Sequence, residues 1–384
     1  MDRAPFEQID IGLYSISTTK EICAVAQRVE ERGFRRLWLA ENYHSRGVIA
    51  QAAAVAAATN TIEIGFGILN PFTRHPALIA MEIAALEEQA GPRIVLGLGA
   101  AWSAIKAHGI ENPRPITALR EAGEICRRLL RGERVEFEGK VFRLPSPGIR
   151  IDFPLARRGV PLYFGTLGPR TLKMAASMAD GIFFSVLCTP AFVAYGMEHV
   201  RAGAAEAGRA VEDMDIACYV IFAVDPDGDA ARQAVKGLVA HYVMRIPDTA
   251  RFIHAGLAVD RMAALQKDLR EAEGENRLAA AVEALPDDVV RALAVAGTPE
   301  EYVEGLRVFA AAGIKTPILY HVAGERPPGR RGPDRRSDRA GAHRRIGQRG
   351  MTPCGGGAWF RAPWTKARTP FPPKPASTCA SGPC

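Results

Sequence analysis

The sequence predicts a (β/α)8 barrel over residues 1–323, followed by a basic tail over residues 324–384. Eight short apolar or β-branched runs alternate with alanine-rich amphipathic stretches, which is the order of elements in this barrel. The turn after the first run, Ser15–Thr19, contains no glycine, which argues against a doubly wound dinucleotide-binding sheet. Aliphatic residues become rare after Val322, so the barrel is expected to end there.

The eight runs have the composition of buried strands. Each is short, rich in Val, Ile, Leu and aromatic residues, and bounded by turn-forming residues. They are Ile9–Ile16, Arg36–Ala40, Thr61–Leu69, Arg93–Gly99, Pro161–Thr166, Gly181–Leu187, Met214–Val224 and Thr316–Val322.

The stretches between the runs carry helix start and stop signals. Glycine follows the first three, proline stands near the start of the next two, and Thr298-Pro299-Glu300-Glu301 forms a capping box before the last. The predicted helices are Thr18–Arg32, His75–Gln89, Pro115–Arg131, Pro169–Ala179, Pro190–Ala207 and one from Pro299 to about Ala312.

Two insertions account for the length beyond a bare barrel. The first is a hairpin over Val135–Phe142, in which Glu138-Gly139 is the predicted turn between two alternating strands. The second is helical and runs from about Ala230 to Val295.

The tail has a composition typical of disordered chain. Residues 325–384 contain no Leu, no Val and one Ile, with 10 Pro, 9 Gly and 11 Arg, which is too little aliphatic surface to offset chain entropy. They carry 13 Lys+Arg against 3 Asp+Glu, whereas residues 1–324 carry 36 against 39, so the net charge of +7 comes from the tail. A non-selected extension is the favoured interpretation, and a nucleic-acid-binding arm is the less favoured one.

Composition also bounds the class of protein. The seven cysteines show no CxxC or Cys/His spacing typical of a metal site, so we expect reduced thiols and no metal. No apolar run reaches 18 residues, and Met1–Phe6 lacks the pattern of a secretory signal. We therefore expect a cytoplasmic protein without a membrane span.

In barrel enzymes the active site lies at the C-terminal ends of the strands. Glu41, His44 and Arg46 follow the second predicted strand and are candidates for proton transfer or ligand anchoring, with a solvated loop as the alternative. Gly165-Thr166-Leu167-Gly168 follows the fifth strand and precedes a helix. Its amides are a candidate phosphate site, with a plain turn as the alternative.

Four segments together resemble the bacterial luciferase-like oxidoreductases, and within them the branch that uses the deazaflavin coenzyme F420, such as methylenetetrahydromethanopterin reductase. They are Gly33–Glu41, Ile64–Pro76, Val95–Gly99 and Leu162–Arg170. Within the second, Asn-Pro-Phe-Thr-Arg-His-Pro favours F420 over FMN.

The resemblance implies that the coenzyme ring lies across the strand ends and is backed by a non-proline cis peptide, which Gly67–Ile68 matches here. The coenzyme phosphate is then expected on Gly165–Gly168, and a homo-oligomer is usual for the family. The cofactor-binding residues implied in this way are Glu41, Asn42, Arg46, Gly67, Ile68, Asn70, Thr73, Gly165, Thr166, Leu167 and Gly168.

Two positions depart from the family pattern. The acid–histidine pair that often ends the second strand is Glu41-Asn42 here, and Trp102 matches the aspartate that follows the fourth strand in the reductase. The substrate of the reductase is therefore not assigned to this protein. The sequence predicts an F420-dependent oxidoreductase that transfers a hydride to or from an unidentified small organic substrate. The alternatives are an FMN-dependent monooxygenase and a non-catalytic flavin- or deazaflavin-binding barrel.

Overall fold

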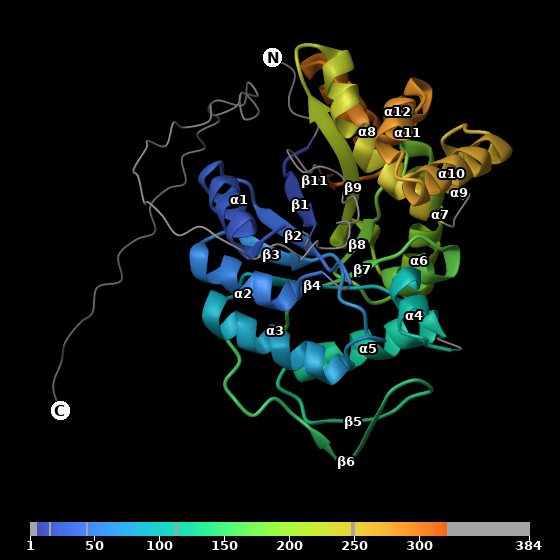
Figure 1. Ribbon diagram of the computed structural model, residues 1–384. Coiled ribbons are helices and arrows are strands. Elements are labelled where there is room, and N and C mark those ends of the chain that lie inside the picture. Colours follow the sequence, from blue (N-terminus) through green and yellow to red (C-terminus); the bar gives the residue numbers. More distant parts are fainter. Residues whose placement is uncertain (1–5, 15–16, 44, 112–113, 247–249, 321–384) are drawn as a thin grey trace, which may run out of the picture. The chain divides into compact units, whose positions relative to one another are not determined.

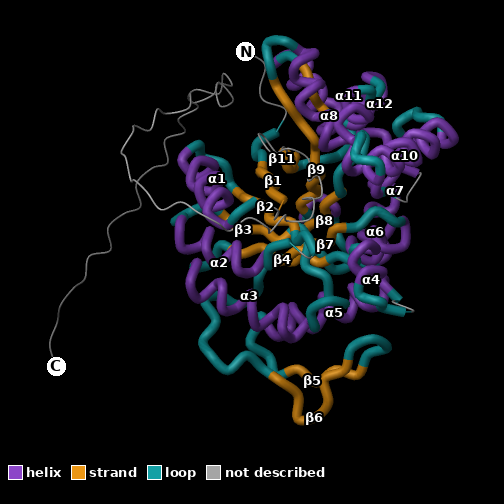
Figure 2. Tube along the Cα trace, in the orientation of Figure 1, coloured by secondary structure: helices purple, strands orange, loops and turns teal. Residues whose placement is uncertain are grey.

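The computed structural model describes residues 6–14, 17–43, 45–111, 114–246 and 250–320 (Figure 1). Within these residues eight parallel strands pair in the order β9-β11-β1-β2-β3-β4-β7-β8, and β8 pairs with β9 to close the sheet. The helices lie around this closed sheet (Figure 2). The predicted (β/α)8 barrel is thus confirmed.

Each predicted strand is present, with shorter ends in most cases. The barrel strands are β1 (Asp10–Tyr14), β2 (Arg36–Ala40), β3 (Glu63–Phe66), β4 (Ile94–Leu98), β7 (Leu162–Gly165), β8 (Gly181–Phe184), β9 (Asp215–Val224) and β11 (Thr316–Tyr320). β3 was expected to reach Leu69 and stops at Phe66. The Gly67–Ile68 bond interrupts it, and Leu69 then makes a single bridge to Leu98.

The predicted helices are also present, and their caps explain their starts. Thr18 and Thr298 both accept a hydrogen bond from a backbone N–H three residues on and complete capping boxes with Glu21 and Glu301. The helices are α1 (Thr19–Glu31), α2 (Val48–Ala58), α3 (Pro76–Ala90), α4 (Trp102–Ala107), α5 (Pro115–Leu129), α6 (Pro169–Ala176), α7 (Pro190–Glu206), α8 (Gly228–Arg245), α9 (Ala250–His254), α10 (Val259–Gly274), α11 (Leu278–Glu283), α12 (Asp287–Leu293) and α13 (Pro299–Ala311), with a short 3-10 helix at Val211–Asp213.

The hairpin exists, but its second strand was placed wrongly. β5 (Val135–Glu138) pairs with β6 (Arg143–Ile149), so residues 139–142 form the turn. The reason is the Glu121 carboxylate on α5, which accepts hydrogen bonds from the backbone N–H groups of residues 140, 141 and 142 at 2.7–3.0 Å. A carboxylate so far away in the sequence stabilises a wider turn than Glu138-Gly139 alone would form. In Figure 2 this hairpin lies apart from the barrel strands.

The helical insertion is also present, with one strand that was not predicted. α8 to α12 gather beside β9 (Figure 1), and β10 (Val295–Gly297) pairs with the far end of β9 through Phe222, Ala223 and Val224. β9 is long enough to pair with β11 along its first half and with β10 along its last residues.

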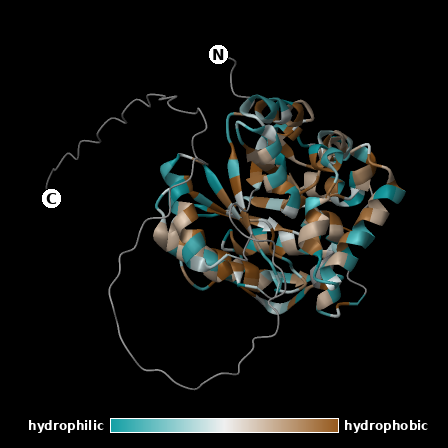
Figure 3. Cartoon of the chain, turned by 45° about the horizontal axis from the view of Figure 1, so that its top comes forward, coloured by the Kyte–Doolittle hydropathy of each residue, from teal (hydrophilic) through white to brown (hydrophobic). Residues whose placement is uncertain are grey.

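Alternate residues of the strands point into the barrel. Large side chains such as Trp38, Phe183, Tyr219 and Ile318 fill its interior, while a second core lies between the strands and the surrounding helices. Figure 3 shows hydrophilic and hydrophobic stretches alternating along the helices, as expected where one side of a helix is buried.

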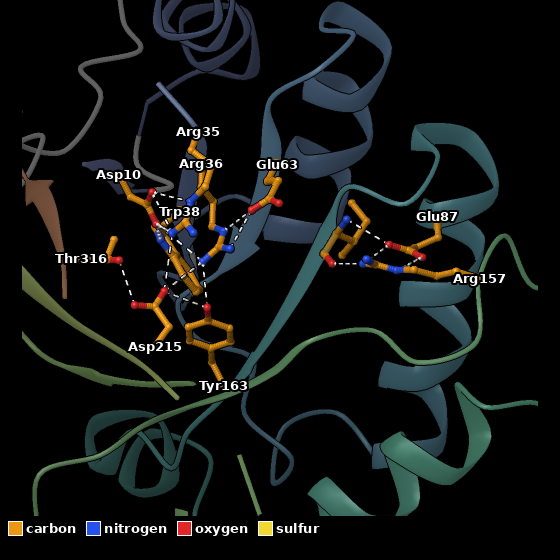
Figure 4. A network of polar contacts seen from close by, with 11 residues as sticks. Asp10, Arg35, Arg36, Trp38, Glu63, Glu87, Arg157, Tyr163, Asp215 and Thr316 are labelled. Atoms are coloured by element: carbon orange, nitrogen blue, oxygen red, sulfur yellow. Dashed lines mark hydrogen bonds and ion pairs between the residues drawn. The ribbon is translucent and has the colours of Figure 1, made fainter. Parts of the chain in front are cut away.

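The N-terminal ends of the strands are joined by a buried network of charges (Figure 4). Arg36 Nη2 lies 2.6 Å from Glu63 Oε2, and the Tyr163 hydroxyl donates to Asp215 Oδ2 at 2.9 Å. Asp10 accepts from Trp38 Nε1 at 2.8 Å and is fully buried. Because this end of a barrel is the one opposite the active site, we assign the network to stability.

The chain divides by its internal contacts into Met1–Gly332 and Pro333–Cys384. The predicted domain boundary at residue 323 and the tail lie outside the described residues. Among the described residues, Cys23, Cys126, Cys188 and Cys218 are free thiols. None of the described helices is long and apolar enough to cross a membrane.

Candidate active site at the strand ends

The segment that follows β3 bridges two neighbouring strands at the C-terminal end of the barrel. The Gly67–Ile68 peptide bond is cis, as the resemblance implied. Gly67 N donates to Leu39 O of β2 at 2.9 Å, and Leu69 N donates to Gly97 O of β4 at 2.8 Å. The segment is therefore anchored to the strands on both sides of β3.

Ile68 lies against two glycines at the strand ends. A Cβ atom at Gly99 would lie 2.9 Å from Ile68 Cγ1, and one at Gly165 would lie 2.7 Å from Ile68 Cγ2. Only residues without a side chain let the strands approach Ile68 so closely. The structure thus brings together Gly67, Ile68 and Gly165 of the predicted cofactor-binding set.

The predicted phosphate segment joins β7 to α6. Gly168 is the N-cap residue of α6 and makes no side-chain cap, so no side chain of its own covers the positive end of the helix dipole. The Thr166 hydroxyl donates to Thr171 Oγ1, which donates to Gly168 O at 2.8 Å. Thr166 therefore uses its proton within the turn, and backbone N–H groups are the better donors for an anion.

Glu41 lies at the end of β2, with a side chain that is 10% exposed. Its Oε1 is 3.3 Å from Arg74 Nη1, and Arg74 Nε is 3.0 Å from Glu82 Oε2 on α3. Glu41 Oε2 is buried without a hydrogen-bond partner among the described residues. The structure therefore places two carboxylates around one guanidinium at the mouth of the barrel.

Asn70 and Tyr43 lie beside this group. Asn70 is fully buried, and its Oδ1 accepts from Phe72 N at 3.0 Å. Burial, and then the negative charge of Glu41, raise the pKa of Tyr43 to about 12, so its hydroxyl keeps its proton at neutral pH. Thr73 Oγ1 donates to Asn70 O at 3.1 Å and so belongs to the same turn.

Four other candidates were named from the sequence, and for two of them the relevant atoms fall outside the described residues. His44 falls outside the described residues, and so does the environment of the Trp102 side chain. Arg46 is exposed, and its charge acts on Glu21 of α1. Asn42 is half-buried, and its carbonyl accepts from Ser45 N at 3.2 Å.

Sequence reasoning missed Tyr43, Arg74, Glu82 and Tyr219. Arg74 stands inside the Asn-Pro-Phe-Thr-Arg-His-Pro segment, which was a signal for it, and Tyr43 is adjacent to the named candidates. Glu82 and Tyr219 carried no such signal. One lies within a helix and the other faces the barrel interior, and only the tertiary structure brings them to the site.

A groove of about 340 Å³ lies elsewhere, on the outer helical wall. It is lined by α5 residues such as Arg120 and Arg127, by Arg131 just after α5, and by Ser177 and Met178 after α6. Its residues do not come from the C-terminal ends of the strands, so we do not assign the chemistry to it. The described residues contain no group of three or more His, Cys, Asp or Glu side chains placed to hold a metal ion.

Comparisons with known proteins agree with this geometry. The family model for luciferase-like monooxygenases matches residues 4–316. The 5,10-methylenetetrahydromethanopterin reductase of Archaeoglobus fulgidus is 31% identical over 286 residues, covering 74% of this chain and 84% of that protein. An F420-dependent glucose-6-phosphate dehydrogenase of Nocardia farcinica is 26% identical, covering 79% of this chain and 88% of that one.

Solved structures give the same result. The coenzyme F420-dependent tetrahydromethanopterin reductase of Methanopyrus kandleri superposes with a TM-score of 0.74 at 28% identity, covering 82% of this chain and 92% of that one. With the barrel closed, the strand ends bridged by Gly67–Ile68 and the family model matched over most of the chain, this protein belongs to the luciferase-like monooxygenase family.

Proposed function

We propose that the protein is an F420-dependent oxidoreductase that transfers a hydride between the deazaflavin coenzyme and a small organic substrate. The observation that carries the proposal is the packing of Ile68 against Gly99 and Gly165, beside the start of α6. It supplies an apolar surface for a planar ring, next to backbone amides for a phosphate. The N. farcinica relative and the M. kandleri structure, both named as F420-dependent enzymes, add support for this coenzyme.

The residues at the strand ends fit the coenzyme. Buried Glu41 Oε2 lacks a partner in the described chain, and such a group is usual where a ligand completes the hydrogen bonding. Gly99 and Gly165 lie directly against the Ile68 side chain, where a Cβ atom on either would collide with it. Gly67 and Ile68 would then contact the ring, and Gly165–Gly168 would contact the phosphate.

When bound, F420 supplies C5 as the carrier of the hydride. The protein would orient the ring, shield one face of it and exclude water from the other. Glu41 is the described carboxylate that best fits a role in binding or proton transfer at the mouth, and His44 stays a candidate from the sequence. The substrate is left open, because Asn42 and Trp102 replace the histidine and aspartate of the family pattern.

We further propose that the protein forms a homo-oligomer through α2 and α3. α2 contains no charged residue, and α3 exposes Leu78 and Met81 to 50% and 46%. The two helices are adjacent, and exposed apolar side chains such as Leu78 and Met81 are common at interfaces. A cytoplasmic location stays part of the proposal.

Anaerobic turnover tests the proposal against the flavin alternative. A hydride transfer with F420 proceeds without oxygen, whereas a monooxygenase stops when oxygen is removed. The protein is incubated with reduced F420 and a panel of imine, ketone and enone acceptors, and the reappearance of oxidised F420 absorbance is followed under argon. Oxygen-dependent turnover with reduced FMN, and none with F420, would contradict it.

A further inference from the structure

Glu41 Oε2, at the end of β2, is a buried carboxylate oxygen without a hydrogen-bond partner among the described residues. The charge of Glu41 acts on Tyr43, whose hydroxyl lies within hydrogen-bonding reach of the Asn70 and Thr73 side chains. A buried carboxylate oxygen without a partner costs free energy, so it requires an explanation.

Arg74 connects Glu41 to a second carboxylate, that of Glu82. Its Nη1 lies 3.3 Å from Glu41 Oε1, and its Nε lies 3.0 Å from Glu82 Oε2. The three side chains are 10%, 21% and 28% exposed, so solvent screens the ion pairs only in part. Arg74 therefore occupies one oxygen of Glu41 and leaves the other free.

Backbone hydrogen bonds hold the main chain of Arg74 in place. Asn70 O accepts hydrogen bonds from Thr73 N at 3.2 Å and from Arg74 N at 3.1 Å. Asn70 Oδ1 holds Phe72 N in the same turn. α3 begins two residues after Arg74, at Pro76, so Arg74 lies between a closed turn and a helix start.

We propose that Arg74 is a positioning residue that orients Glu41 for the coenzyme. By binding Oε1, with Glu82 holding its other side, Arg74 reserves Glu41 Oε2 as the acceptor for an N–H or O–H donor on bound F420. This inference rests on the proposed function. The two contacts use different nitrogens of the planar guanidinium, a geometry that the single ammonium of lysine does not reproduce.

Glu82 helps to hold the Arg74 guanidinium in place through its ion pair. Burial raises its pKa, the charge of Arg74 opposes that change, and the charge of Glu41 adds to it. Removing the Glu82 charge would leave the Arg74 guanidinium paired with Glu41 alone, so that its orientation is less restrained. We therefore expect a smaller effect from Glu82→Gln than from a change of Arg74 itself.

The test measures F420 affinity by fluorescence titration of the full chain in six proteins: wild type, Arg74→Lys, Glu82→Gln, Glu41→Gln, the double variant Arg74→Lys/Glu41→Gln, and a control. The control is Arg143→Gln, which breaks an ion pair with Glu138 on the hairpin whose side chains are 69% and 71% exposed. We expect about tenfold weaker binding for Arg74→Lys, a few-fold for Glu82→Gln and no change for the control.

The double variant separates positioning from general destabilisation. If Arg74 acts through Glu41, Arg74→Lys has little further effect once Glu41 is Gln, whereas a merely structural role makes the two losses multiply. Wild-type affinity in a folded Arg74→Lys variant, or fully multiplicative losses, would overturn the inference while leaving the proposed function intact. Wild-type protein that does not bind F420 would overturn the proposed function, and with it this inference.

Discussion

Replacing Gly67 by Ala measures how tightly the end of β3 packs over the barrel interior. A Cβ atom at Gly67 would lie 2.1 Å from Tyr219 Oη and 3.2 Å from Tyr219 Cζ. The Tyr219 ring has little room to move, because it makes edge contacts with Phe183 and Tyr320 at centroid distances of 5.7 and 5.6 Å. The added methyl group must therefore displace either the ring or the segment that carries Ile68.

The size of the effect follows from that contact. Overpacking a core costs about 1–3 kcal/mol, and a 2.1 Å approach to the end of a confined ring belongs in the upper part of this range. We expect Gly67→Ala to lower the free energy of unfolding by about 2–3 kcal/mol. With an unfolding entropy of about 2.1 cal/mol/K per residue, this is a fall of about 3–5 °C in Tm.

Tyr219→Phe supplies the matched partner variant. It removes the atom in closest contact, and the hydroxyl has no hydrogen-bond partner among the described residues, so alone it should change stability by less than about 1 kcal/mol. In that background the nearest ring atom to the new methyl group is Cζ at 3.2 Å, and Gly67→Ala should cost about 1 kcal/mol or less.

Urea unfolding of the four proteins of this double-mutant cycle gives the coupling energy directly, provided that the m values agree. We expect about 2 kcal/mol of coupling between the two positions. If Gly67→Ala costs the same with Tyr and with Phe at position 219, the packing described for this end of the barrel is wrong.

Three further predictions concern separate parts of the chain. Although burial opposes it, hydrogen bonds from the backbone N–H groups of residues 60–62 and the Thr61 hydroxyl lower the pKa of Glu30 to about 2. The stability this adds is present above about pH 4.5 and lost as the pH falls through about 2. Glu30→Gln should therefore cost about 1 kcal/mol at pH 7 after allowance for solvent screening, with a flatter acid-unfolding profile. Gly168→Glu should weaken F420 binding by repulsion at the α6 N-terminus, while Gly274→Glu, in open space, should leave it unchanged in the same titration. Deleting residues 325–384 should change the free energy of unfolding by less than about 0.5 kcal/mol, because the tail has almost no aliphatic side chains to bury; a loss of several kcal/mol would show a shared core.

Local signals explain most of the fold that was predicted. The capping boxes at Thr18 and Thr298 use residues three positions apart, so the starts of α1 and α13 can be read from the sequence. α2 was not predicted, because Val48–Ala58 is apolar except for Gln51 and so shows no helical period of polar and apolar residues. The hairpin turn was misplaced because it depends on Glu121, which lies in another element.

The site residues could be predicted only where they directly follow a strand in the sequence. Gly67, Ile68 and Gly165 were named from strand ends and from the family resemblance, and the structure brings them into contact. Glu82 and Tyr219 reach the same region from a helix and from the barrel interior. Their contacts depend on tertiary packing between distant elements, and no motif in the sequence predicts them.

The identity of the bound coenzyme is the result on which the whole proposal depends. Purified full-length protein is titrated with F420 and, side by side, with FMN, and the two dissociation constants are compared at equal ionic strength. We predict saturable binding of F420 at one molecule per chain and at least tenfold weaker binding of FMN. Binding of FMN that equals or exceeds that of F420 would contradict the proposal.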